Sequence, residues 1–239
     1  MRQFVIADIH GGYRALMQCF ERAKFDYEKD ELFVLGDTVD GWTETDKCIT
    51  ELLKLRKCIN IIGNHDLWFL NWALRGHAPI EWTTQGGDNT MACYGNEYIN
   101  VPQAHKEFFM NANSWIEIED DDIKRLFIHA GFDPNKDMSK QTIDLVTWDR
   151  DLLSWARKKH NSRPDYKYGG FDEVFIGHTT TNSFDKDGYK SEPKHYCNIW
   201  ALDTGGGWEG KLTIMNIKTK EFFQSDHVYT LYPDEKGRG

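Results

Sequence analysis

The 239-residue sequence is poor in cysteine, proline and positive charge. Its five cysteines include no Cys-x-x-Cys pair, which favours reduced thiols in a cytoplasmic protein. Six prolines and 20 glycines are too few for a collagen-like or low-complexity chain. Lys and Arg number 29 against 38 Asp and Glu, a net charge of −9, so we expect no nucleic-acid partner, because that binding depends on a basic surface.

Long apolar runs are missing as well. No stretch approaches the roughly 18 uncharged apolar residues of a transmembrane helix, and the first residues do not read as a signal peptide, so we expect no membrane association. Hydrophobic residues nevertheless make up 40% of the chain and aromatic residues 14%. With no internal repeat or linker-like stretch, we predict one domain spanning residues 1–239.

The first third of the chain predicts a repeated strand–loop–helix unit. Short apolar runs at residues 3–7, 32–35 and 59–62 each end in a polar, glycine-containing loop, and apolar residues at helical spacing follow each loop. This order is typical of βαβαβ with parallel strands. Residues 71–113 are less regular, and we expect a helical and loop excursion that roofs a site.

The second half predicts further strands at residues 125–129, 174–177, 199–202 and 212–216, with helix near residues 143–159. Because few helices intervene, we expect a more antiparallel sheet there. The run Asp120-Asp121-Asp122 predicts a hairpin turn between two strands.

Polar residues follow five of these predicted strands. Asp8, Asp37 and Asn64 come directly after the first three, 29 and 27 residues apart. Ligand groups at the carboxyl ends of parallel strands converge on one place. The expected metal ligands are Asp8, His10, Asp37, Asn64, His129 and His178.

The ligand types narrow the choice of metal ion. Asp, Asn and His without thiolate suit Mn, Fe, Zn or a mixed pair, and of these we favour Mn. Two divalent ions, two carboxylates and one bridging hydroxide leave one net positive charge, which attracts a phosphate dianion. We therefore expect two divalent metal ions that share one carboxylate.

Five blocks resemble the calcineurin-like metallophosphoesterases, most closely the bacterial and phage branch related to Ser/Thr protein phosphatases and symmetrical diadenosine-tetraphosphate hydrolases. The blocks are Asp8-Ile-His10-Gly, Gly36-Asp37-Thr-Val-Asp40, Gly63-Asn64-His65-Asp66, His129-Ala-Gly and Gly177-His178-Thr. With weaker secondary matches, the resemblance extends from residue 3 to about residue 216. It implies an α/β fold, a four-layer α/β/β/α sandwich of two mixed sheets.

The resemblance also implies residue roles. Asp8, His10 and Asp37 would hold the first metal, and Asp37 would bridge to a second held also by Asn64, His129 and His178. His65 would be the general acid, with Asp40 as the carboxylate that raises its pKa. Arg150 and Asn64 would bind the substrate's phosphate.

The sequence departs from the family pattern at one position. Family phosphatases commonly carry Arg directly after the second Asp of the Gly-Asp-x-x-Asp block, whereas this chain has Gly41-Trp42. One expected bidentate phosphate contact is therefore missing. We expect Trp42 to be a packed indole rather than a platform for a base.

The resulting hypothesis is a binuclear-metal phosphoester hydrolase in which a metal-bridging hydroxide attacks directly. The phosphorylated substrate would be a phosphomonoester, of the kind that a Ser/Thr protein phosphatase takes. One alternative is a dinucleoside-polyphosphate hydrolase. An alternative of another class is a catalytically silent scaffold of the same fold, which a complete ligand set disfavours.

Overall fold

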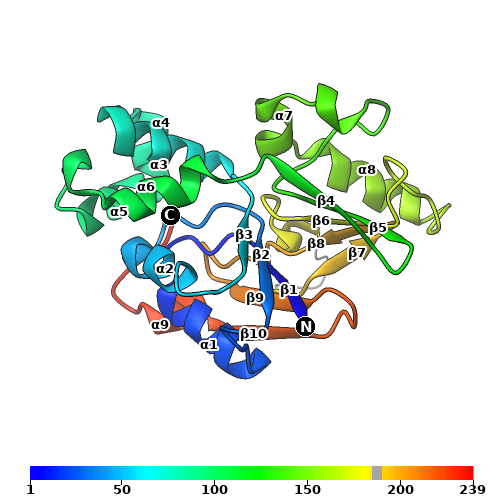
Figure 1. Cartoon of the computed structure of the whole chain (residues 1–239), viewed down its shortest axis with the longest axis horizontal. Coiled ribbons are helices and arrows are strands. Elements are labelled where there is room, and N and C mark those ends of the chain that lie inside the picture. The colour runs from blue at the N-terminus through cyan, green and yellow to red at the C-terminus, as the bar shows by residue number, and fades with distance from the viewer. Residues whose placement is uncertain (185–189, 239) are drawn as a thin grey trace.

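Two five-stranded sheets form the centre of the computed structural model, which describes residues 1–184 and 190–238 (Figure 1). The first sheet has the order β10-β9-β1-β2-β3. Its strands are β1 (Gln3–Ile6), β2 (Glu31–Val34), β3 (Cys58–Asn60), β9 (Lys211–Asn216) and β10 (Phe222–His227). β1, β2 and β3 run parallel, and β9 and β10 are antiparallel to their neighbours.

The second sheet has the order β4-β5-β6-β8-β7. Its strands are β4 (Trp115–Asp120), β5 (Ile123–Ile128), β6 (Glu173–Ile176), β7 (Lys194–Tyr196) and β8 (Ile199–Ala201). β5, β6 and β8 run parallel, whereas β4 and β7 form antiparallel edges. The predicted turn at Asp121-Asp122 joins β4 to β5 as a hairpin.

The helices cover the two outer faces. α1 (Tyr13–Ala23), α2 (Thr45–Leu52) and α9 (Val228–Leu231) lie on the first sheet. α7 (Ile143–Trp148) and α8 (Asp151–His160) lie on the second, together with the short 3₁₀ turn η3 (Met138–Lys140) (Figure 1). Another 3₁₀ turn, η4 (Thr181–Phe184), follows β6. The chain therefore has the predicted four layers, helices, sheet, sheet and helices.

Alternation along the strands explains why both faces of each sheet are buried. In β2, Leu32 and Val34 face the helices, whereas Phe33 faces the other sheet. The ring of Phe33 stacks on that of Phe127 at 4.2 Å, and Phe127 stacks on Phe175 at 5.0 Å. These rings join the two sheets into one apolar layer.

The expected excursion at about residues 71–113 is helical. After α3 (Asn64–Arg75) it contains α4 (Ile80–Trp82), the π-turn η1 (Thr83–Gly87), α5 (Asp88–Cys93), the 3₁₀ turn η2 (Tyr98–Asn100) and α6 (Gln103–Met110). Aromatic side chains, among them Phe69, Trp72 and Trp82, form a hydrophobic cluster within it. The excursion bonds to the loop after β2, where N–H of Gly41 donates to the carbonyl oxygen of Gly86 at 3.2 Å.

The expectation of a more antiparallel second sheet is wrong in two respects. Two of its four strand pairings are parallel, because the segment containing α7 and α8 returns the chain to the same edge before β6. The predicted strand at 212–216 belongs to the first sheet instead, where β9 pairs antiparallel with β1. Among the described residues, no helix is both long and apolar enough to cross a lipid bilayer.

Candidate metal centre

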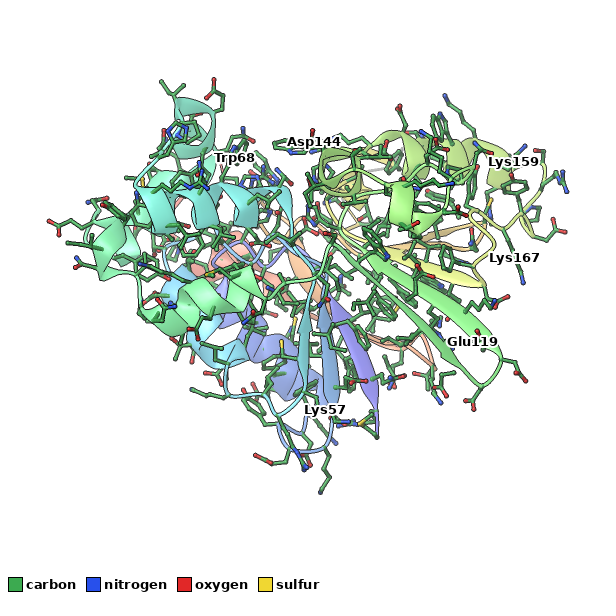
Figure 2. The ribbon with its side chains drawn as sticks, turned by 45° about the horizontal axis from the view of Figure 1, so that its top comes forward. Lys57, Trp68, Glu119, Asp144, Lys159 and Lys167 are labelled. Carbon is green, nitrogen blue, oxygen red and sulfur yellow. The ribbon has the colours of Figure 1, made fainter. Side chains whose placement is uncertain are left out.

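The predicted ligands lie at the carboxyl ends of parallel strands. Asp8 and Asp37 follow β1 and β2, and Asn64 begins α3 just after β3. His129 directly follows β5, and His178 follows β6. In Figure 2, Trp68, on the helix that follows β3, lies in the upper part of the view, and Lys57, which precedes that strand, lies toward the bottom.

Several of these residues have an unusual backbone conformation. The φ angles of Asp8, His10, Asp37 and His178 are 53°, 48°, 51° and 63°. A left-handed conformation costs a residue with a side chain about 1–2 kcal/mol. Strain of this kind persists only where the surrounding structure holds it, and it is concentrated at functional sites.

Two clusters of buried ligand atoms share one carboxylate. Within each cluster the potential ligand atoms lie within 4.8 Å of one another, and the clusters are Asp8, His10, Asp37 and Asp37, His129, His178. Oδ2 of Asp37 is 3.8 Å from Nε2 of His10 and 3.4 Å from Nε2 of His129. Oδ1 of Asn64 lies 3.1 Å from the same His129 nitrogen. All six predicted ligands are therefore at one place.

Backbone carbonyl groups orient two of the imidazoles. Nδ1 of His10 lies 3.0 Å from the carbonyl oxygen of Val39, and Nδ1 of His129 lies 2.6 Å from that of Leu35. A carbonyl oxygen only accepts, so each Nδ1 carries a proton. Nε2 of each ring is directed to the cluster and would offer its lone pair to a metal once it is deprotonated. Histidine ligands of metals are held in this way.

The ring of His178 gives a second indication of a metal site. Its Nε2 is buried and, among the described residues, has no hydrogen-bond partner. Burial, aided by the positive charges of His129 and Arg150, lowers the pKa of His178 to about 2, so the ring is neutral. A neutral, buried and unpartnered imidazole beside a carboxylate fits a divalent metal ion.

His129 differs from His178 because it faces Asp37 directly. Burial lowers its pKa, but the adjacent Asp37 carboxylate outweighs burial and raises the pKa to about 9. Without a metal, the proton on His129 thus partly neutralises the acidic cluster. A divalent cation would take over that role, so the residues present fit a metal pair.

His65 and Asp40 form a buried pair next to the clusters. Nδ1 of His65 lies 2.6 Å from Oδ2 of Asp40, and Nε1 of Trp82 donates to the same oxygen at 2.7 Å. The expected rise in the pKa of His65 is wrong for the metal-free chain. Burial lowers that pKa to about 3 despite the attraction of Asp37, and the positive charge of Arg238 adds to the lowering.

Asp66 supports the loops that carry these groups. Its carboxylate accepts hydrogen bonds from the N–H groups of Asp37, Thr38 and Gly63, at 2.9, 3.0 and 3.0 Å. The side chain thereby ties the loop after β2 to the start of α3. The place of Asp66 in the Gly63-Asn64-His65-Asp66 block indicated a functional residue, but only the structure shows which N–H groups it binds.

The two expected neighbours of a bound phosphate, Asn64 and Arg150, differ in exposure. Asn64 is buried, whereas Arg150 is exposed and donates from Nη1 to the carbonyl oxygen of His178 at 3.1 Å. Trp42 is a packed indole, as expected. It is 1% exposed, and its Nε1 donates to the carbonyl oxygen of Gly206 at 2.8 Å.

Sequence reasoning missed Trp82, which holds Asp40, and above all Arg238. Nη2 of Arg238 lies 2.7 Å from Nε2 of His65, and Nη1 lies 3.3 Å from Nε2 of His10. A guanidinium group only donates, so His65 accepts here and carries its proton on Nδ1. No sequence motif surrounds Arg238, and only the fold reveals its position.

Comparisons with known proteins identify the family of the chain. The model of the family described as Calcineurin-like phosphoesterase matches residues 1–182. Serine/threonine-protein phosphatase 1 of Salmonella typhimurium is 25% identical over 219 residues, 90% of this chain and 91% of that protein. A symmetrical bis(5'-nucleosyl)-tetraphosphatase of Buchnera aphidicola is 28% identical over 141 residues, 58% of this chain and 47% of that protein.

Solved structures show the same fold. A crystal structure assigned as a diadenosine tetraphosphatase superposes with a TM-score of 0.66 and 16% identity, covering 93% of this chain and 92% of the other. The family model covers most of the chain, and the family uses divalent metals. The chain belongs to the calcineurin-like phosphoesterase family and is a hydrolase of phosphoesters.

Proposed function

We propose that the chain is a phosphomonoesterase that removes phosphate from phosphoserine or phosphothreonine with the help of two divalent cations. The observation that carries the proposal is the pair of buried ligand clusters that meet at Asp37, with His65 beside them. The proposed ligands of the first cation are Asp8, His10 and Asp37, and those of the second are Asp37, Asn64, His129 and His178.

The donor set supports Mn²⁺ as the metal, because carboxylate, amide oxygen and imidazole suit it and no thiolate takes part. When bound, such a pair supplies a nucleophilic water near neutral pH and positive charge for the phosphate. The five free cysteines are consistent with a cytoplasmic protein.

His65 is the proposed general acid. Asp40 accepts from its Nδ1, which orients the ring and leaves Nε2 directed toward the clusters. The leaving oxygen of a phosphomonoester needs a proton from this nitrogen. Nε2 accepts from Arg238 and carries no proton, so it must first take up a proton from solvent, which requires Arg238 to move away from His65 when the substrate binds. The negative charge of the bound phosphate favours this protonated ring, which then gives the proton to the leaving oxygen.

Asn64 and Arg150 are the proposed phosphate contacts from the sequence. Their placement beside His178 and His129 supports this role, since a phosphate oxygen at the second cluster would lie near both side chains. Arg150 is exposed, so it would contact the outer face of the phosphate.

Relatives named as serine/threonine-protein phosphatases and relatives named as tetraphosphatases both match almost all of the chain. The Salmonella protein named serine/threonine-protein phosphatase 1 is matched over 91% of its length and supports the phosphomonoester, whereas a symmetrical bis(5'-nucleosyl)-tetraphosphatase of Actinobacillus succinogenes is matched over 98% of its length and supports the second candidate below. The complete set of ligand positions disfavours a silent scaffold.

One observation favours the second candidate, a dinucleoside-polyphosphate hydrolase. Trp68 and Trp148 meet edge to face at 5.1 Å beside His65 and His178, and Trp148 is 43% exposed. Exposed indoles at the edge of a phosphate site are suited to stacking on a base.

The test compares kcat/KM of the Mn²⁺-loaded chain on a phosphothreonine peptide and on diadenosine tetraphosphate in one buffer. We expect faster hydrolysis of the peptide. Faster hydrolysis of the dinucleotide would overturn the phosphomonoesterase proposal, and Trp148→Ala would then show whether the indole binds the base. Less than one metal per chain after loading would overturn the binuclear site.

A further inference from the structure

The segment after α9, residues 232–238, lies back across the loop that follows β2. We name it the tail segment. The ring of Tyr232 stacks on Trp42 with centroids 5.0 Å apart. The carboxylate of Glu235 accepts from Oγ1 and N–H of Thr43 at 2.8 and 3.2 Å.

The conformation of Gly237 brings the next residue to the metal centre. Its φ is +65°, and a Cβ there would lie 2.7 Å from the carbonyl oxygen of Gly207 and 2.9 Å from the ring of Trp42. The N–H of Arg238 then donates to that same carbonyl oxygen at 3.1 Å. The backbone of Arg238 is thus held in place, while its side chain reaches His65 and His10.

The guanidinium group of Arg238 has N–H donors that are not used in hydrogen bonds to the described residues. Besides the two imidazoles, Nη2 approaches Oε1 of Gln85 at 3.3 Å, and the group lies over the ring of Trp208 at 5.2 Å. Its Nε is buried without a partner, and no carboxylate pairs with Arg238 within the part of the chain that the structure describes. A guanidinium group whose side-chain hydrogen-bond partners are all neutral, and which keeps a free donor, can accept an anion as a further partner.

Gly41 leaves the space that Arg238 fills. Its φ is +92°, and a Cβ at Gly41 would lie 3.1 Å from Cγ of Arg238. Position 41 is where family phosphatases commonly carry the arginine that this chain lacks. The tail segment therefore brings a guanidinium group to the neighbourhood of position 41 from the other end of the sequence.

We propose that Arg238 is a phosphate-binding residue, supplied by the tail segment in place of an arginine at position 41. The inference rests on the proposed function, since it assigns Arg238 to the same phosphoester site. When a metal occupies Nε2 of His10, Nη1 loses that acceptor and becomes free for a phosphate oxygen. Two parallel N–H donors from one guanidinium group match two non-bridging phosphate oxygens.

The experiment compares Arg238→Ala, Arg238→Lys and the wild-type chain, all loaded with Mn²⁺. Lys236→Ala is the matched control, because Lys236 is a cation of the same segment that is exposed. Binding of inorganic phosphate is measured by calorimetry, and kcat/KM is measured with p-nitrophenyl phosphate. Metal content and circular dichroism are recorded for every variant.

We expect Arg238→Ala to weaken phosphate binding by about 10- to 100-fold and to lower kcat/KM by a similar factor. Arg238→Lys should recover part of the loss, because it keeps the charge but not the paired donors. Lys236→Ala should match the wild type. If Arg238→Ala fails to fold, Arg238→Gln retains most of the side-chain packing and tests the same donors.

Unchanged phosphate binding in a folded, metal-loaded Arg238→Ala would overturn the inference. So would a rise in activity, because the tail segment would then be blocking the site. The proposed function fails separately. A wild-type chain that holds Mn²⁺ and binds phosphate through Arg238, yet hydrolyses no phosphomonoester, would refute the function and keep Arg238 as a phosphate ligand.

Discussion

Replacing Trp42 by alanine should destabilise the protein strongly. The indole is 1% exposed, stacks on Tyr232 and donates to Gly206. Loss of a buried tryptophan side chain costs about 3–5 kcal/mol. For a chain of this size, 1 kcal/mol lowers Tm by about 2–4 °C, so we expect a fall of about 6–20 °C. Trp42→Phe keeps a ring but leaves the Gly206 carbonyl unpaired, which costs about 1–3 kcal/mol.

The measurement is thermal and urea unfolding followed by far-UV circular dichroism, with metal bound in every sample. Trp155→Ala is the control, because Trp155 is 47% exposed and its loss should change stability by less than about 1 kcal/mol. Trp42→Ala should also weaken phosphate binding, because the tail segment packs on the indole. A Tm within about 2 °C of the wild type would refute this account of Trp42.

Three further predictions concern the metal centre. His65→Asn should lower kcat by about 10²–10⁴-fold with unchanged Mn²⁺ content, and loss of metal by elemental analysis would show that His65 is a ligand instead. Asp37→Asn should reduce occupancy at both metal positions and abolish most activity, since both clusters include this carboxylate; near-normal turnover would contradict a shared ligand. In chelator, burial keeps the pKa of His65 at about 3, below the value of about 6.5 in the unfolded chain. Below pH 6.5 the unfolded chain therefore binds a proton at His65 that the folded chain does not bind. The free energy of unfolding falls for this reason as the pH falls through 6.5. Between pH 7 and 5 the wild type should lose about 2 kcal/mol more than His65→Asn in urea unfolding, whereas parallel pH profiles would refute the lowered pKa.

The sequence predicted those parts of the site that follow directly from the first three strands and the loops after them. The loops bearing Asp8 and Asp37 follow strands whose apolar runs are evident, and parallel strands bring their ends together, so the cluster could be predicted. The contact between Arg238 and His65 joins residues 173 positions apart, and no periodicity predicts it. The pKa of His65 depends on burial by the whole fold, so reasoning from the Asp40 partner alone gave the wrong direction.

The pairing of β1 with β9 could not be predicted from the sequence either, because the two strands are far apart along the chain. The apolar run at 212–216 predicted a strand correctly, but its partner lies about 200 residues earlier in the sequence. Proximity along the chain suggested the sheet of β5 and β6, whereas the return of the chain to the first sheet is a long-range event.

The position of β9 between β1 and β10 has a consequence for biosynthesis. Until β9 has been synthesised, β1 can pair on one side only, with β2. The other edge of β1 then presents unpaired N–H and C=O groups, which can pair with a strand of a neighbouring nascent chain. The strained loop at Asp8 also lacks the hairpin that completes its sheet, so metal uptake should come late, after residues 211–227 have emerged and closed that edge.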